Sequence, residues 1–367
     1  MEQIHYVDTE SELLALCRVF AEQPWIALDT EFVREETYFP RLCLLQLAVP
    51  GTVACVDPLV LSLDPLLDVI YDRAITKVFH ACHQDLETLF HLHGALPTPL
   101  FDTQIAAPLL GLPAQASYAR LVEDVLGTHL EKAHTRTDWS RRPLSTEQLD
   151  YAADDARYLG PLYLHLRDRL SELGRLQWLE EDFTAACDPA RYNGATPQDA
   201  WRRIRGTQHL SGRQLAILQA LAAWREATAR RADRPRGWIL RDEIMIELAC
   251  TAPSSKAGLD ALHVSGKTIA RHGDDLLAAI ASGSGAPELT PARGAKPSPL
   301  TSTEEALFER MSSLVQEQSK HYGIDAAVLA SRNDLVDLIR KEGNASLRLL
   351  TGWKRHAIGE QLLQLKS

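Results

Sequence analysis

Two carboxylates lie two residues apart in an apolar segment near the N-terminus. Asp29 and Glu31 stand in the run ALDTEF, which has the composition of a β-strand. Side chains at positions i and i+2 of a strand point to the same face, so the two carboxylates share one face. The neighbouring positions on that face are Ala27 and Val33, which carry no positive charge. A buried carboxylate needs a partner that offsets its charge. A divalent metal ion is a natural partner, although a strand end in water would also accommodate the pair.

A third carboxylate, Asp85, follows the apolar run KVFHAC and opens the helical pattern QDLETLF. A carboxylate in the first turn of a helix is stabilised by the helix N-terminus, so Asp85 taken alone has a simpler role than metal binding. His80 and His83 lie close by in the sequence, but a magnesium site built from oxygen atoms does not need them. We expect these histidines to be hydrogen-bonded rather than to be ligands.

A pair of adjacent aspartates, Asp154 and Asp155, occurs in the helical pattern LDYAADDARYL. On a helix, Asp154 shares its face with Asp150 and Arg157, which predicts a solvated face with a weak surface ion pair. Asp155 shares a largely apolar stripe with Tyr151, and this stripe should turn toward the sheet. A carboxylate on a buried face needs a partner more than one in water does. Asp155 is therefore the predicted metal ligand, and Asp154 is not.

The elements that position these residues alternate between strands and helices in the first half of the chain. Five short β-rich runs occur: IHYV, WIALDTEF, RLCLLQLAV, TVACVD and KVFHAC. The helical patterns ESELLALCRVFAEQ and QDLETLFHLHG separate some of them, and a short turn at Pro50-Gly51 joins two others. An antiparallel start followed by crossovers predicts an α/β domain with a mixed sheet.

Strand signals stop at about Phe101, and the rest of the chain has helical patterns. The segments FDTQIAAPLL, SYARLVEDVLG and 145–174 are predicted to be helical, the last with Ser145 or Thr146 as its N-cap. Turn-forming residues mark a boundary near 190–205, and the Gly/Pro/Ser-rich segment Ser282–Thr303 predicts a flexible linker. The domain boundaries are predicted at 1–190, 206–285 and 300–367.

Composition limits the class of protein. Of the 367 residues, 45% are hydrophobic and 24% are charged, which is typical of a soluble globular chain. The sequence has no apolar run of about 18 residues, so no membrane span is predicted. The N-terminus lacks the pattern of a secretory signal. The six cysteines are scattered, without a CxxC pair and mostly in apolar runs. They predict buried thiols in a reducing cytoplasm rather than zinc ligands or disulfides.

The most basic segment runs from Arg202 to Arg241, although the net charge of the whole chain is −10. It holds ten arginines and only two acidic residues, and Trp201, Trp224 and Trp238 are interleaved with them. Such a segment suits phosphate contact and base stacking, but a solvated helical face with core tryptophans has the same pattern. We favour RNA contact for the arginines and core packing for the tryptophans.

Taken together, these segments resemble the DEDD superfamily of 3′→5′ exonucleases. DTE is similar to its first motif, FHACHQDLETL to its second and YAADD to its third. A tyrosine four residues before the last aspartate is typical of the DEDDy branch. The wider text, including DTEFVREETYFPRLCLLQLA and WSRRPLSTEQLDYAADDARYL, resembles the ribonuclease D family. LQALAAWREATARRADRPRGWILRDEIMIELA resembles an HRDC domain, and LASRNDLVDLIRKE with LLTGWKRHAIGEQLL resembles a second, divergent HRDC unit.

The resemblance implies a ribonuclease H-like exonuclease domain with a mixed sheet, followed by two small helical bundles of the HRDC type. It implies that four carboxylates hold two divalent ions, Mg²⁺ or Mn²⁺, and that Tyr151 positions the attacking water. The four are Asp29, Glu31, Asp85 and Asp155. We interpret Thr30 and Phe32, which flank two of these ligands, as candidate substrate contacts. Phe32 could stack on a base or be a core aromatic residue on the opposite face of the strand.

The implied activity is hydrolytic trimming of structured RNA from its 3′ end, with release of 5′-nucleotides and with tRNA precursors as the expected partner. A DNA exonuclease of the same superfamily is the first alternative, because recognition of the 2′-hydroxyl depends on the geometry of the pocket. A non-catalytic RNA-binding scaffold is the second, and the complete set of five site residues argues against it. We expect a cytoplasmic monomer with no membrane partner.

Overall fold

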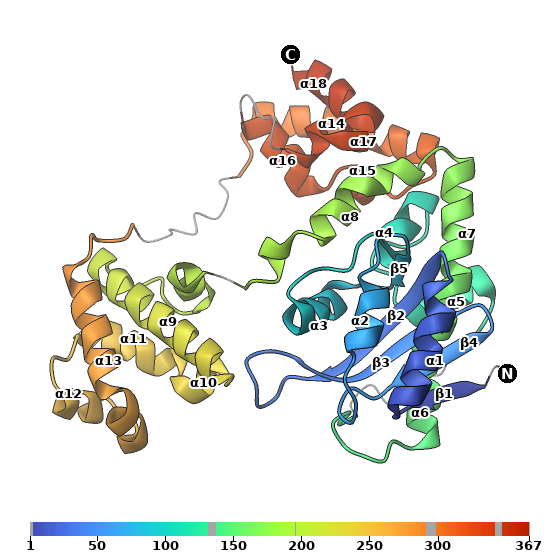
Figure 1. Cartoon of the computed structure of the whole chain (residues 1–367). Coiled ribbons are helices and arrows are strands. Elements are labelled where there is room, and N and C mark those ends of the chain that lie inside the picture. The colour runs from blue at the N-terminus through green and yellow to red at the C-terminus, as the bar shows by residue number, and fades with distance from the viewer. Residues whose placement is uncertain (1–2, 131–136, 195, 291–298, 342–346, 367) are drawn as a thin grey trace. The chain divides into compact units, whose positions relative to one another are not determined.

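The computed structural model describes residues 3–130, 137–194, 196–290, 299–341 and 347–366. They divide into two compact units (Figure 1). The first unit contains Met1–Val33, Leu42–Pro189 and Pro299–Ser367, and the second contains Arg34–Arg41 and Ala190–Ser298. A short segment from the first fifth of the chain is thus grouped with helices from its second half.

A six-stranded sheet forms the centre of the first unit, with the strand order β1-β4-β3-β2-β5-β6. The strands are β1 (Ile4–Val7), β2 (Trp25–Val33), β3 (Arg41–Val49), β4 (Thr52–Val56), β5 (Thr76–Phe79) and β6 (Leu100–Asp102). β3 and β4 are antiparallel and meet at a turn where Gly51 has a φ of 80°. The pairs β1–β4, β2–β5 and β5–β6 are parallel. The predicted mixed sheet is confirmed.

The prediction that strand signals stop at about Phe101 is wrong. β6 pairs with β5 along Leu100, Phe101 and Asp102, and only then does the short helix α4 (Thr103–Ala106) begin. A strand of three residues is too short to show the alternation on which the prediction depended. Asp102 ends the strand and caps α4, because its side chain accepts hydrogen bonds from the backbone of Gln104 and Ile105.

The sheet of the first unit is accompanied by helices whose apolar residues contribute to its core. They are α1 (Glu10–Ala21), α2 (Asp64–Ile70), α3 (His83–His93), α4, α5 (Tyr118–Leu126), α6 (Thr146–Arg157), α7 (Leu159–Glu172) and α8 (Glu180–Ala186). Ser145 is the N-cap of α6 as predicted, in a reciprocal capping box with Gln148. The first turn of α6 is therefore well fixed.

Segment 145–174 is not the single helix that its pattern predicted. α6 ends at Arg157 and α7 begins at Leu159, with Tyr158 between them. Pro161 explains the break, because proline cannot donate a backbone hydrogen bond and its ring crowds the carbonyl four residues earlier. The hydroxyl group of Tyr118 donates to the carbonyl of Asp154 at 2.8 Å at this end of α6.

Helix α7 comes unusually close to the first residue of β2. A Cβ atom on Gly160 would lie 2.3 Å from the ring of Trp25, so only glycine fits at this point of α7. Trp25 and Gly160 are both buried, and Trp25 also packs against Tyr163 with ring centroids 5.8 Å apart. This contact fixes the distance between α7 and the strand that carries Asp29 and Glu31.

The last helices of the chain share the hydrophobic core of the first unit. They are α14 (Ser302–Tyr322), α15 (Ala326–Leu329), α16 (Arg332–Arg340), α17 (Gly352–Lys354) and α18 (Glu360–Lys366). Trp353 stacks on Trp178 with ring centroids 4.6 Å apart and an angle of 2° between the rings. Arg175 donates hydrogen bonds to the carbonyls of Leu109 and Tyr322 at 2.8 and 2.7 Å. Residues from both ends of this unit therefore form one packed body.

The second unit is helical and has its own core. Its main helices are α9 (Gly212–Ala232), α10 (Arg236–Ile239), α11 (Asp242–Thr251), α12 (Lys256–Ala261) and α13 (Gly266–Gly285). The predicted linker Ser282–Thr303 is too long at both ends, because α13 continues to Gly285 and α14 begins at Ser302. Gly283 explains the first error, since a Cβ there would lie 2.5 Å from the Cα of Ile217 on α9. Residues 291–298 of this linker lie outside the described residues.

Gly160→Ala should destabilise the first unit, because its methyl group would overlap the Trp25 ring. We expect a loss of about 1–3 kcal/mol in the free energy of unfolding, measured by urea denaturation. Gly266→Ala is the control, because a Cβ there meets nothing within 4 Å. In a Trp25→Leu background, Gly160→Ala should cost less than it does in the parent. An equal cost in the two backgrounds would show that the Trp25 contact does not require glycine.

Candidate active site

Three of the predicted carboxylates meet where β2 and α6 come together. Oxygen atoms of Asp29, Glu31 and Asp155 lie within 4.8 Å of one another. Asp29 and Glu31 come from β2, which lies between β3 and β5 in the sheet, and Asp155 comes from the last turn of α6. The structure thus brings together residues more than a hundred positions apart. These three residues form what we call the acidic cluster.

Asp85 joins this group from the first turn of α3, where it is only 7% exposed. Its Oδ1 atom accepts two hydrogen bonds from Thr30, one from the hydroxyl group at 2.6 Å and one from the backbone N–H at 3.1 Å. Thr30 stands between Asp29 and Glu31 on β2, so these bonds hold Asp85 beside the acidic cluster, and its negative charge raises the pKa of each cluster residue. A fourth carboxylate therefore belongs to the site.

Burial raises the pKa of all four carboxyl groups, and the charges of neighbouring site carboxylates raise those of Asp29, Glu31 and Asp155 further. Burial is the largest cause in each case, and it raises the pKa of Glu31 to about 8 and the pKa values of Asp85 and Asp155 to about 7. The pKa of Asp29 lies well above its ordinary value because of burial and then the charges of Asp85, Asp155 and Glu31. Within the described residues, none of the four forms an ion pair with lysine or arginine. Crowded carboxylate oxygens without a protein cation are the donor set that Mg²⁺ and Mn²⁺ prefer.

Tyr151 lies one turn before Asp155 on α6. Burial raises the pKa of its phenol group, and the charges of Asp155, Glu31 and Asp29 raise it further. The ring packs almost parallel to that of Trp139, with centroids 6.4 Å apart and an angle of 24°. A phenol with a raised pKa keeps its proton at neutral pH and is able to donate a hydrogen bond.

Asp154, the other member of the doublet, is not part of the acidic cluster. Its carboxylate pairs with the guanidinium of Arg157, as predicted. The predicted solvated face is only partly exposed, because Asp150 lies in solvent but the side chains of Asp154 and Arg157 are 35% and 16% exposed. Helix periodicity nevertheless separated the two aspartates correctly.

His80 is hydrogen-bonded at both ring nitrogens, as expected for a histidine that is not a ligand. Nδ1 lies 2.9 Å from Oγ1 of Thr103, and Nε2 lies 3.1 Å from the carbonyl of Ala116. Its ring packs against Tyr118 with centroids 5.6 Å apart. Tyr118 was missed in the sequence although it lies near the site, since burial and then the charges of Asp155 and Asp29 raise its pKa. No motif spacing connects Tyr118 with the carboxylates, so the sequence held no signal for it.

The two predicted substrate contacts have different surroundings. Thr30 is buried and its hydroxyl group is bound to Asp85, so it supports the carboxylate directly. Phe32 is half-buried, and it is not among the buried hydrophobic residues of the described chain. A contact between Phe32 and substrate stays a prediction, and so does one for Thr30.

Comparison with known proteins agrees with this architecture. A family model described as 3′-5′ exonuclease matches residues 4–171, and one described as HRDC domain matches residues 214–280. A protein from Granulibacter bethesdensis named ribonuclease D is 40% identical over 371 residues, which cover 98% of this chain and 92% of that protein. A ribonuclease D from Acidiphilium cryptum is also 40% identical, over 98% of this chain and 92% of its own length.

A solved structure has the same fold over nearly the whole chain. It is the crystal structure of Escherichia coli RNase D, described as an exoribonuclease involved in structured RNA processing. The TM-score is 0.82 at 35% sequence identity, and the match covers 99% of this chain and 98% of that one. The predicted fold, a mixed-sheet exonuclease domain with an HRDC helical domain, is confirmed.

A divalent metal ion should stabilise the folded protein, because it offsets the repulsion among the four carboxylates. We expect saturating Mg²⁺ or Mn²⁺ to raise the melting temperature by about 5 °C. Asp155→Asn should raise the melting temperature without metal and should remove most of the metal-induced shift. Asp154→Asn is the matched control, since its carboxylate pairs with Arg157, and it should keep the shift. A full metal-induced shift in Asp155→Asn would contradict this assignment.

Thr30→Val should weaken metal binding without removing a ligand, because Asp85 would lose the hydroxyl donor that fixes Oδ1. We expect the Mg²⁺ concentration for half-maximal thermal stabilisation to rise about tenfold. Thr30→Ser keeps the hydroxyl group and should stay near the parent value. An unchanged Mg²⁺ dependence in Thr30→Val would show that the hydrogen bond does not orient the carboxylate.

Proposed function

Because this chain belongs to the ribonuclease D family and is a 3′→5′ exoribonuclease, we propose that it trims the 3′ ends of structured RNA, chiefly tRNA precursors. The family model and the full-length relatives support the activity. The observation that carries the proposal is the acidic cluster with Asp85 and Tyr151 beside it. The Escherichia coli relative is described as acting in structured RNA processing, which favours a structured substrate here.

The exonuclease family is metal-dependent, and we propose that Asp29, Glu31, Asp85 and Asp155 hold two divalent ions, Mg²⁺ or Mn²⁺. Such a pair, when bound, supplies a hydroxide-like nucleophile and stabilises charge on the leaving 3′-oxygen. The donor set consists of carboxylate oxygens, which suit these hard cations rather than zinc. Asp29 and Glu31 are fixed by the sheet, and Asp85 is fixed by Thr30.

The role of Tyr151 in this proposal is to orient the attacking water. Its raised pKa keeps the phenol protonated at neutral pH, so it does not remove a proton from water. Trp139 limits the movement of its ring, and α6 places it one turn from Asp155. A fixed hydrogen-bond donor beside the acidic cluster lowers the entropic cost of aligning the water with the phosphodiester.

The products of this reaction would be 5′-nucleotides, removed one at a time from a free 3′ end. We propose that Phe32, half-buried and one residue after Glu31, contacts the terminal nucleotide by stacking on its base. Stacking is tolerant of sequence because every base has a flat face. This fits an enzyme that removes successive nucleotides of different identity.

The proposed organisation assigns the exonuclease to residues 1–190 and HRDC-type bundles to residues 206–285 and 300–367. The last segment packs in the same unit as the exonuclease, so its role is proposed to be support of that fold. The helices of the described chain include none that is long and apolar enough to cross a membrane. We place the enzyme in the cytoplasm as a monomer, because RNA processing occurs there and the carboxylates all come from one chain.

A time course with a 3′-extended tRNA tests the reaction. The parent should shorten it from the 3′ end with Mg²⁺ or Mn²⁺ and should be inactive with EDTA. Asp155→Asn should lower the rate at least about 100-fold, because it removes a charged ligand. Asp154→Asn should stay near the parent rate, and a matched DNA strand should be cut more slowly than RNA. Full activity of Asp155→Asn or of the parent in EDTA would rule out the metal-dependent mechanism, and full loss in Asp154→Asn would show that the wrong aspartate was chosen.

A further inference from the structure

The last turn of α6 carries Asp155 and has backbone carbonyl groups that α6 itself cannot satisfy. In an unbroken helix the carbonyl of Asp154 would accept a hydrogen bond from the N–H of Tyr158. Here the chain turns at Tyr158, and this N–H is directed to the carbonyl of Ala156 instead. The break therefore leaves the Asp154 carbonyl without its helical donor, at the residue directly before a predicted metal ligand.

The hydroxyl group of Tyr118 supplies a donor from outside α6. It donates a hydrogen bond to the carbonyl oxygen of Asp154 at 2.8 Å, from the first residue of α5. This carbonyl belongs to the peptide unit that joins Asp154 to Asp155, and a peptide unit is planar. The bond therefore fixes the orientation of the backbone from which the Asp155 side chain starts. We call this hydrogen bond the Tyr118 bond.

The packing of α6 against the sheet gives such a bond a role. Ala152, Ala153 and Ala156 are the fully buried residues of α6. Their methyl groups let the helix approach the sheet closely, but they form only low ridges that interlock weakly with neighbouring side chains. Polar contacts therefore contribute more to fixing the position of α6. The capping box of Ser145 acts at its first turn, and the Tyr118 bond acts at its last.

Helix α5 holds Tyr118 in place. The side chain of Ser117 caps α5 by accepting a hydrogen bond from the backbone of its first turn, next to Tyr118. Leu121 and Val122, which follow on α5, are fully buried in the core of the first unit. The donor of the Tyr118 bond is therefore attached to a fixed helix and not to a loose loop.

His80, the residue after β5, supports the ring of Tyr118. The two ring centroids lie 5.6 Å apart. Nε2 of His80 lies 3.1 Å from the carbonyl of Ala116, two residues before Tyr118, and Nδ1 lies 2.9 Å from the hydroxyl group of Thr103. One histidine thus contacts the tyrosine ring and also fixes the backbone that leads to it. His80 is not a ligand, and its contacts instead restrict the movement of Tyr118.

The phenol of Tyr118 lies close enough to the acidic cluster to be affected by it. Burial is the largest cause of its raised pKa, and the charges of Asp155 and Asp29 raise the pKa further. The phenol therefore keeps its proton at neutral pH. This single proton is directed to the Asp154 carbonyl, so it is not offered to water or substrate. Tyr118 consequently differs from Tyr151, to which we assign the attacking water.

We propose that Tyr118 is a positioning residue of the metal site, and that the Tyr118 bond holds Asp155 where its carboxylate can bind a divalent ion. The proposal rests on the proposed function, which supplies the metal ions, and it adds a residue outside the five that the sequence motifs contain. It also gives the two parts of Asp154 different roles. The backbone carbonyl accepts the Tyr118 bond, and the carboxylate pairs with Arg157. Asp154→Asn keeps the carbonyl and therefore keeps the positioning.

Tyr118→Phe in the full-length protein tests the proposal, because it removes only the hydroxyl group and keeps the ring against His80. We expect the Mg²⁺ concentration for half-maximal thermal stabilisation to rise about tenfold, since Asp155 is held less well. With a 3′-extended tRNA and saturating Mg²⁺, kcat should fall about tenfold. KM for the tRNA should stay within about twofold of the parent, because the Tyr118 bond does not contact the substrate.

Tyr71→Phe is the matched control. The hydroxyl group of Tyr71 also donates to a backbone carbonyl, that of Leu89 on α3 at 3.0 Å, four residues beyond Asp85. Each variant loses a phenol hydrogen bond, so the two should melt at similar temperatures without metal. Tyr71→Phe should keep the Mg²⁺ dependence and kcat of the parent. An equal Mg²⁺ dependence in Tyr118→Phe and Tyr71→Phe would overturn the proposal.

The double variant Tyr118→Phe with Asp155→Asn tests whether Tyr118 acts through Asp155. If it does, the loss of rate caused by Tyr118→Phe should nearly disappear once Asp155 is asparagine. An undiminished loss in that background would contradict positioning through Asp155. A raised KM with the kcat and Mg²⁺ dependence of the parent would identify Tyr118 as a substrate contact and would also overturn the proposal. Failure of the proposed function is seen separately, because the parent itself would then neither require nor bind Mg²⁺.

Discussion

Repulsion among four clustered carboxylates, one buried and three half-buried, is the constraint on which the structure of the first unit depends. Asp29, Glu31 and Asp155 lie within 4.8 Å of one another, and Asp85 is close enough to raise the pKa of each. Such a group is stable only when protons or cations offset its charge. The surrounding fold holds the carboxylates together against this repulsion: β2 is paired on both sides, Thr30 binds Asp85, and α6 begins with a capping box. The repulsion lowers the stability of the metal-free fold, and the same crowded carboxylates are what a metal ion would bind.

The sequence predicted which carboxylates lie together because the signals for them were local. Strand alternation placed Asp29 and Glu31 on one face, and helix periodicity chose Asp155 over Asp154. The errors came from features that depend on distant or very short contacts. β6 has only three residues, so its alternation is too short to recognise. The break between α6 and α7 was missed because the helical pattern continues past Pro161, the residue that interrupts the helix. Neither the bond between Thr30 and Asp85 nor the position of Tyr118 could be found in the sequence, because both depend on tertiary packing.

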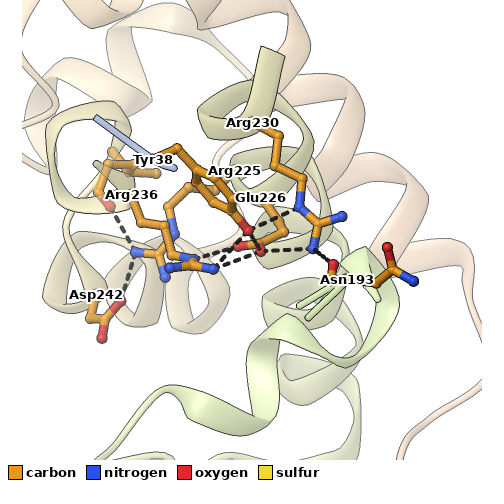
Figure 2. A network of polar contacts seen from close by, with 8 residues as sticks. Tyr38, Asn193, Arg225, Glu226, Arg230, Arg236 and Asp242 are labelled. Atoms are coloured by element: carbon orange, nitrogen blue, oxygen red, sulfur yellow. Dashed lines mark hydrogen bonds and ion pairs between the residues drawn. The ribbon is translucent and has the colours of Figure 1, made fainter. Parts of the chain in front are cut away.

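Domain limits drawn along the chain miss two groupings that exist in three dimensions. Arg34–Arg41 leads from the end of β2 to the first residue of β3, yet Tyr38 belongs to the polar network of the helical second unit (Figure 2). Residues 300–367 were predicted to form a separate HRDC-like bundle, yet Trp353 stacks on Trp178 within the core of the first unit. Composition and turn residues mark a domain boundary only where few contacts are made across it. At these two predicted boundaries, aromatic and arginine side chains make contacts with residues on the other side.

Manganese binding to the full-length protein tests the central claim most directly. Electron paramagnetic resonance counts bound Mn²⁺ and distinguishes isolated ions from a coupled pair. Four carboxylates around a two-ion site predict two bound Mn²⁺ per chain with a spin-coupled signal, retained in Asp154→Asn and lost in Asp155→Asn. A single uncoupled ion in the parent, or an unchanged coupled signal in Asp155→Asn, would contradict a site in which Asp155 helps to hold two metal ions.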